Sequence, residues 1–261
     1  MDHQVKTAIT CVSKEEIRVR GYDLGELIGR ASFGETAFLL LTGREGSPAE
    51  CRMLEAILIA CMDHGVDAPS THVARTTASC GVPVQAAISA GILAIGENHG
   101  GAGEQCARIL QEAVQAQPEA ELNALARGIV ETAKEAGRRL PGFGHRQHDP
   151  DPRAVALMEK ARELKVAGKY MALALEIQKE LSARSGRSLP LNVDGTIAAL
   201  ISDMGMDWRF GKSLFIIGRT VGLAAQVHEE MTCGKPLKFA RPVQAEYTGP
   251  APRAWRQEEE A

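Results

Sequence analysis

Hydrophobic residues recur at helical spacing along most of the chain. Leu54, Ile57, Leu58 and Cys61 fall at positions i, i+3, i+4 and i+7, which predicts one buried stripe on a helix that begins at Pro48. Similar apolar or amphipathic patterns predict further helices over 36–42, 84–95, 104–116, 119–138, 153–166, 169–183, 194–204 and 208–231. The chain is therefore expected to be nearly all α-helical.

Polar residues at the ends of these runs predict where helices begin and end. Ser32 and Glu35 have the spacing of a capping box before the helix over 36–42, and Gly43 follows that helix. Ser70 and Thr71 are expected to cap another helix that runs through 74–77.

A strand signal is confined to 7–20, where apolar residues flank the polar turn 13–16. The expected fold class is mainly α, a multi-helical fold with a small N-terminal β-hairpin. The 261 residues, 44% of them hydrophobic, suffice for one large domain or two unequal ones.

Composition argues against a nucleic acid or a membrane as the binding partner of this protein. The net charge is −3 and aromatic residues make up 4% of the chain, too few for base-stacking platforms, so no nucleic-acid partner is expected. The first residues lack the pattern of a signal peptide, and no apolar run reaches the ~18 residues that span a bilayer. These features predict a cytoplasmic protein without a membrane partner.

Cysteine and histidine spacing does not favour a metal centre or a disulfide framework. The six cysteines are dispersed without a Cys-x-x-Cys pair and are interpreted as reduced thiols, with a cysteine nucleophile as the lesser alternative. His145 and His148 have i, i+3 spacing, but Pro150 and Pro152 disfavour a helix there. No metal ion is expected.

Three glycine-flanked segments each present one proton-transfer residue. His99 lies within 96–103, His145 within 141–146, and Asp194 within 191–195. Two imidazoles and a carboxylate are suited to carbon–carbon bond chemistry beside a carbonyl, in which an enolate forms and protons move on carbon and oxygen. The segments are far apart, so this hypothesis requires the fold to bring them together.

Each residue also has a plainer interpretation. His99 precedes a helix N-terminus, which favours a neutral imidazole, but it is equally well explained as a capping or loop histidine. Asp194 by itself fits a helix N-cap better than a catalytic group. Arg219 lies in an apolar stretch and needs an anion, either a carboxylate of the protein or one of a substrate.

The segment 138–146 is basic and rich in glycine. It is expected either to hold phosphate groups of a nucleotide-like ligand or to form a solvated loop after a helix that ends in cations. The candidate ligand-binding residues are Arg138, Arg139, Gly142, Gly144 and Arg146.

Taken in order, these segments resemble the citrate synthase superfamily. The similarity rests on His-Gly-Gly-Ala at His99, Gly-Phe-Gly-His-Arg at His145 and Asn-Val-Asp at Asp194, together with 19–24 and 32–43 near the N-terminus. Further matches are His64 in Asp-His-Gly, Arg153 in Asp-Pro-Arg, Arg219 in Gly-Arg-Thr-Val-Gly and Arg241 in Ala-Arg-Pro.

Two departures indicate the branch of the superfamily. The segment between Gly43 and Asp63 is much shorter than in full citrate synthases, so much of the large helical domain is missing. Gly195 after Asn-Val-Asp, and the run 90–96 before His99, resemble the citryl-CoA lyase module of ATP-citrate lyase and compact stand-alone citryl-CoA lyases. The eukaryotic module lacks a histidine at the position of His99, so the chain combines two patterns.

The resemblance implies a fold, a set of roles and an assembly. It implies a truncated large domain from 1–103 and 207–261, with a small CoA and catalytic domain over 104–206. It implies cleavage of citryl-CoA, or a close analogue, to acetyl-CoA and oxaloacetate, with a CoA thioester as substrate and no tightly bound cofactor. The catalytic residues would be His99, His145 and Asp194, and the carboxylate-binding residues His64, Arg153, Arg219 and Arg241.

The same resemblance implies a homodimer or higher homo-oligomer with a shared active site, because the family's arginine near Arg241 comes from the neighbouring subunit. The apolar runs 84–95 and 214–227 are the expected interface helices. Two alternatives stay open: a short citrate or alkylcitrate synthase that also hydrolyses the thioester, and a non-catalytic CoA-binding subunit.

Overall fold

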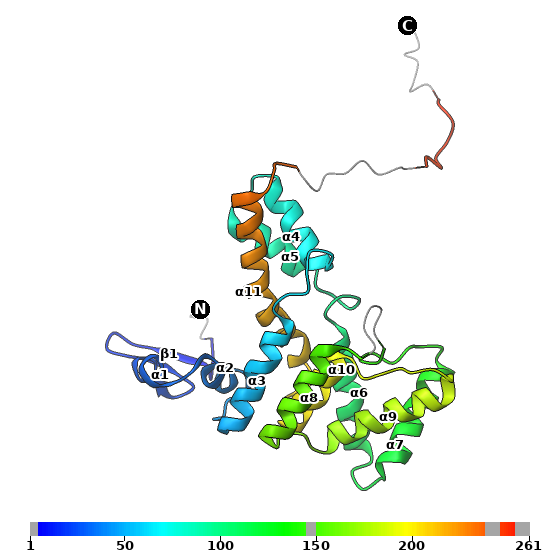
Figure 1. Ribbon diagram of the computed structural model, residues 1–261. Coiled ribbons are helices and arrows are strands. Elements are labelled where there is room, and N and C mark those ends of the chain that lie inside the picture. Colours follow the sequence, from blue (N-terminus) through cyan, green and yellow to red (C-terminus); the bar gives the residue numbers. More distant parts are fainter. Residues whose placement is uncertain (1–4, 145–149, 238–245, 254–261) are drawn as a thin grey trace, which may run out of the picture.

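The structure is a computed structural model that describes residues 5–144, 150–237 and 246–253. A small antiparallel sheet comes first, in the order β1-β2-β3, from β1 (Thr10–Val12), β2 (Ile17–Val19) and β3 (Tyr22–Asp23). The helices of the described residues are α1 (Leu24–Arg30), α2 (Phe33–Thr42), α3 (Pro48–Cys61), α4 (Pro69–Ser79), α5 (Val84–Leu93), α6 (Ala102–Ala116), α7 (Leu122–Glu135), α8 (Pro152–Leu164), α9 (Lys169–Ser185), α10 (Val193–Asp203) and α11 (Phe210–Cys233). The predicted mainly α fold class is confirmed (Figure 1).

Local signals determine several element ends as predicted. The Ser32 side chain accepts from the Glu35 backbone and the Glu35 side chain accepts from the Ser32 backbone, so the capping box of α2 is complete. Gly43 ends α2 in the left-handed conformation, with φ 77°. The hairpin is confirmed with Thr10 opposite Val19, and a short third strand, absent from the sequence prediction, extends it.

One predicted cap is wrong. The helix α4 begins at Pro69, after an extended Ala68 that provides no side-chain cap. Proline suits the first helical position because its missing N–H has no partner to lose there. Ser70 and Thr71 therefore lie inside the first turn, where both side chains are fully buried.

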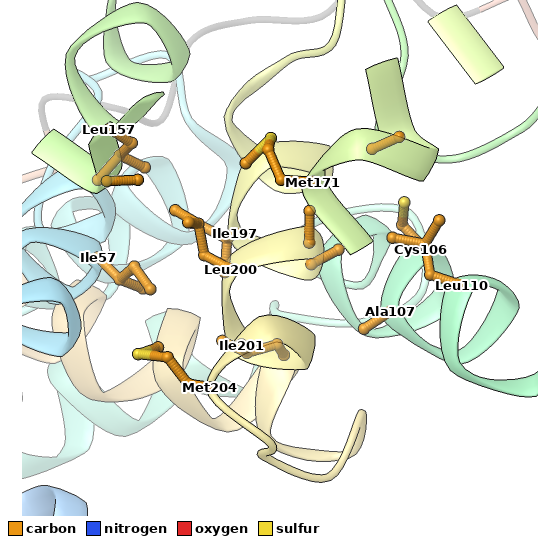
Figure 2. Close-up of a cluster of buried hydrophobic side chains, with 14 of the residues drawn as sticks. Ile57, Cys106, Ala107, Leu110, Leu157, Met171, Ile197, Leu200, Ile201 and Met204 are labelled. Atoms are coloured by element: carbon orange, nitrogen blue, oxygen red, sulfur yellow. The ribbon is translucent and has the colours of Figure 1, made fainter. Parts of the chain in front are cut away.

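The helix α10 is the centre of the main core. Its residues from Gly195 to Ser202 are all buried, and it packs against α6, α8 and α9. Figure 2 shows Ile197 and Leu200 of α10 between Ile57 and Leu157 on one side and Cys106 on the other. Because this run of α10 is buried on every side, α10 anchors the helices that surround it.

A second, smaller core joins α4, α5 and α11. Ala74, Ala87 and Leu223 are fully buried there, and the small side chains let the helices approach closely. The long helix α11 also packs on α3 and α6 and so connects the two cores (Figure 1). The division into domains at 103 and 206 stays a prediction.

No helix in the described part of the chain combines the length and the apolar character that crossing a bilayer requires.

Candidate active site

Residues predicted from distant segments line one cavity of about 480 Å³. The first residues of four helices, α4, α6, α8 and α10, border it. Helix N-termini carry unpaired N–H groups and partial positive charge, so the cavity is suited to an anionic ligand. The predicted site residues in its lining are His64, His99, Gly144, Arg153, Asp194 and Arg219.

The side chain of His99 is held by Ser70. The Nε2 atom lies 2.9 Å from Ser70 Oγ and 3.3 Å from the Ser70 backbone N, which donates to it. Arg219 Nη1 donates to the same Ser70 Oγ at 3.0 Å, which leaves the hydroxyl proton of Ser70 for Nε2. Two donors on Nε2 require an unprotonated nitrogen, so we assign the single ring proton of His99 to Nδ1.

Electrostatics favour the same neutral form. Burial lowers the pKa of His99, and the positive charge of Arg219 lowers it further. The ring also packs edge-on against Phe215, with centroids 5.6 Å apart. The alternative role of His99 as a cap is wrong, because Gly101 is the N-cap residue of α6.

Asp194 lies in the first turn of α10 and is partly buried in the cavity wall. The cap interpretation is wrong here too, because Asn192 caps α10 by accepting from the Gly195 backbone at 3.1 Å. Burial raises the pKa of Asp194, although the nearby charges of Arg153 and Arg219 lower it in part. A carboxyl group whose pKa is raised stays protonated to a higher pH than an ordinary one, so it holds a proton that it can give to carbon.

Arg219 is 2% exposed and is bound by neutral oxygens. Its Nε donates to the Cys61 carbonyl at 3.0 Å, and its guanidinium lies 4.9 Å from the ring centre of Phe215. Within the described ranges no carboxylate forms an ion pair with it, and burial lowers its pKa. Of the two anions left open by the sequence, this arrangement favours a substrate carboxylate.

Arg153 is positioned by a residue to which the sequence analysis gave no role. Asp151 is 1% exposed and pairs with the Arg153 guanidinium through two hydrogen bonds of 3.1 and 3.0 Å. The signal was available, since Asp151 belongs to the same Asp-Pro-Arg motif that singled out Arg153. His64 is exposed at the edge of the cavity.

A second cavity of about 660 Å³ adjoins the first, and Gly144 borders both. Its cationic lining comprises two predicted residues, Arg138 and Arg139, and three others, Lys134, Arg184 and Arg187. Such a set of cations suits phosphate groups.

Gly142 borders neither cavity, and its role in ligand binding stays a prediction. It is buried with φ 89°, and an added Cβ would lie 2.7 Å from the Gly195 Cα. Two residues on, the Gly144 backbone N–H donates to the Pro190 carbonyl at 2.7 Å, and the Gly144 carbonyl accepts from the Asn192 side chain at 2.7 Å. These contacts hold the loop against the start of α10.

Three predicted site residues, His145, Arg146 and Arg241, lie outside the described residues. Among the residues that the structure describes, no group of three or more His, Cys, Asp or Glu side chains is arranged to hold a metal ion.

A mainly α-helical fold whose cavity gathers two histidines, an aspartate and two arginines is that of the citrate synthases and the lyases related to them. Residues 41–243 match the family model described as citrate synthase, C-terminal domain, and the chain belongs to this family. The predicted resemblance is therefore confirmed.

Individual relatives include lyases and synthases. A structure of citryl-CoA lyase from Hydrogenobacter thermophilus is 40% identical with a TM-score of 0.87, covering 97% of this chain and 98% of that one. ATP-citrate synthase beta chain protein 1 of Arabidopsis thaliana is 28% identical over 244 residues, and putative citrate synthase 2 of Mycobacterium tuberculosis is 32% identical over 234. These alignments cover 87% of this chain but only 37% and 59% of those relatives, respectively.

Proposed function

We propose that the protein cleaves citryl-CoA, or a close 3-hydroxy-3-carboxyacyl-CoA, to acetyl-CoA and oxaloacetate. The observation that carries the proposal is one cavity in which a neutral His99 and a carboxyl group of raised pKa lie beside two arginines. The similarity to a citryl-CoA lyase over nearly the full length of both chains supports it.

Each of the three catalytic residues has one role in the reaction. His145 takes the proton of the tertiary hydroxyl, the carbonyl of oxaloacetate forms, and the carbon–carbon bond breaks. The electron pair passes to the departing fragment, which becomes the enolate of acetyl-CoA. The Nδ1–H of His99 donates to the enolate oxygen, and Asp194 gives its proton to the terminal carbon to complete the methyl group.

We assign the two halves of the substrate to the two cavities. Arg153, Arg219 and His64, with Arg241, bind the carboxylates of the oxaloacetate half, because the planar guanidinium matches a carboxylate. The CoA end extends past Gly144 into the cationic second cavity, where its phosphates meet cations. This substrate needs no resident cofactor.

A condensing enzyme is the second candidate, because putative citrate synthases are among the relatives. Such an enzyme runs the same steps backwards and then hydrolyses the thioester. The carbon–carbon chemistry uses the same residues in both directions, so only the fate of the thioester separates the two.

The test is incubation with citryl-CoA, and separately with acetyl-CoA plus oxaloacetate, with products identified by mass. We expect acetyl-CoA and oxaloacetate from the first mixture, above a protein-free blank. Release of free CoA from the second mixture would instead identify a synthase, and binding without turnover in both would identify a non-catalytic subunit.

Variants link the activity to the cavity. We expect His99→Ala and Asp194→Ala each to lose about 10²–10³ in rate while staying folded. His228→Ala removes an exposed histidine of α11 outside the cavity and serves as the control. Full activity in either cavity variant would contradict the assigned roles.

A further inference from the structure

Asp151 joins the N-termini of the two helices that carry Arg153 and Asp194. One oxygen caps α8 by accepting from the Arg153 backbone at 3.0 Å. The other carboxylate oxygen, Oδ2, accepts from the backbone N–H of Val193, the first residue of α10, with an N···O distance of 3.2 Å. Both oxygens also accept from the Arg153 guanidinium, through Nε and Nη2.

These four donors keep Asp151 ionised. Burial opposes the charge, but the Arg153 guanidinium and the two backbone N–H groups outweigh it and lower the pKa of Asp151. A carboxylate with this many donors has a fixed charge and no proton to exchange. Asp151 is therefore not itself a proton-transfer group.

We propose that Asp151 is the positioning residue of this site, which fixes Arg153 and Asp194 relative to each other. The proposal rests on the proposed function, because it assigns Arg153 to the substrate carboxylate and Asp194 to the proton on carbon. Asp151 engages Nε and Nη2 of Arg153, and the Nη1 group is not part of that pair. The bond to Val193 sets the start of α10, one residue before Asp194.

The same contacts set the electrostatic field at Asp194. Loss of the Asp151 charge removes a like charge and leaves Arg153 unopposed, and both changes favour ionised Asp194. Its pKa then falls. Among the residues that the structure describes, Asp194 interacts electrostatically with Asp151 and Arg153 at the start of α8 and with Arg219 of α11. It also acts on the thiols of Cys61 in α3 and Cys106 in α6.

The experiment compares Asp151→Asn and Asp151→Ser with a matched control, Asp203→Asn. Asp203 also uses its carboxylate to hold a helix N-terminus, because it accepts from the backbone of Gly168, the N-cap of α9, and of Tyr170 and Met171 in its first turn, but it lies at the far end of α10. Serine keeps a capping oxygen for α8 and removes the charge.

For both Asp151 variants we expect KM for citryl-CoA to rise about tenfold, because Arg153 loses its support. Cleavage requires protonated Asp194, so activity falls as pH rises through its pKa. The alkaline limb of the pH profile should move to lower pH in both variants and stay in place in Asp203→Asn.

Unchanged KM and an unchanged pH profile in the Asp151 variants would overturn the proposal, and so would loss of the fold in both, which would make Asp151 purely structural. If the wild type does not cleave citryl-CoA, the proposed function fails instead. The ¹³C titration of the Asp194 carboxyl in the ligand-free protein then decides: a lower pKa in the variants supports the proposal, and an unchanged one overturns it.

Discussion

At the scale of single residues, the state of His99 depends on Ser70. The serine hydroxyl is positioned between Arg219 and the imidazole, and its backbone N–H also points at Nε2. A neutral imidazole with its proton on Nδ1 is the form that donates to an enolate oxygen without giving up a proton. Ser70 therefore belongs to the candidate site, although its sequence suggested only a helix cap.

We expect Ser70→Ala to lower kcat about tenfold, because the lost hydroxyl no longer orients the ring. That hydroxyl favours unprotonated Nε2, so its loss raises the pKa of His99. The neutral form then disappears at a higher pH, and the acidic limb of the cleavage profile should move upward. Rates measured across pH on purified protein would detect both changes.

Thr71→Val is the matched control for this prediction. Thr71 is the next residue in the same turn, and its hydroxyl is buried without a hydrogen-bond partner in the part of the chain that the structure describes. We expect the kinetics of Thr71→Val to match the wild type. Equal kinetics for both variants would show that Ser70 has no role in catalysis.

At the scale of elements, the junction between α10 and the loop 142–144 is set by a pair of glycines. A Cβ on Gly195 would collide with the Gly142 carbonyl oxygen, and a Cβ on Gly142 would collide with Gly195. The close approach also lets the Asn192 backbone donate to the Gly142 carbonyl at 3.0 Å. Gly142 is predicted from its basic, glycine-rich segment to bind a ligand, whereas its described contacts are packing contacts.

Gly195→Ala should destabilise the protein by about 1–3 kcal/mol, because the methyl group meets backbone rather than a movable side chain. The control is Gly128→Ala in α7, where an added Cβ meets nothing within 4 Å. We expect that change to stabilise by about 0.4–1 kcal/mol. Urea denaturation of the three proteins measures both effects, and equal stabilities for Gly195→Ala and the wild type would contradict the packing argument.

At the scale of the whole molecule, the helices α5 and α11 carry exposed apolar side chains. Val84 and Leu93 of α5 and Val221 of α11 are all exposed, and the two helices pack on each other. These residues lie in the runs predicted as interface helices. We propose that these two helices contribute to the contact in a homo-oligomer whose active site is shared through Arg241.

A shared site predicts that activity per subunit falls when the protein is diluted until the oligomer dissociates. The cause is the loss of the neighbouring arginine from each cavity rather than unfolding. Paired measurements of rate and of mass by light scattering over a dilution series test this. A monomer with full activity would contradict the sharing.

Local signals in the sequence determined most of the secondary structure. Periodicity, capping boxes and glycine ends depend on residues within about four positions of each other, so the N-cap and the end of α2 and the start of α3 followed directly. The resemblance to a family named the residues of the cavity, but their states were decided by tertiary contacts. Ser70 meets His99 across 29 positions and Arg219 across 149. Pairings at such separations depend on how helices pack, which no local pattern encodes, and so only the folded chain revealed the roles of Ser70 and Asp151.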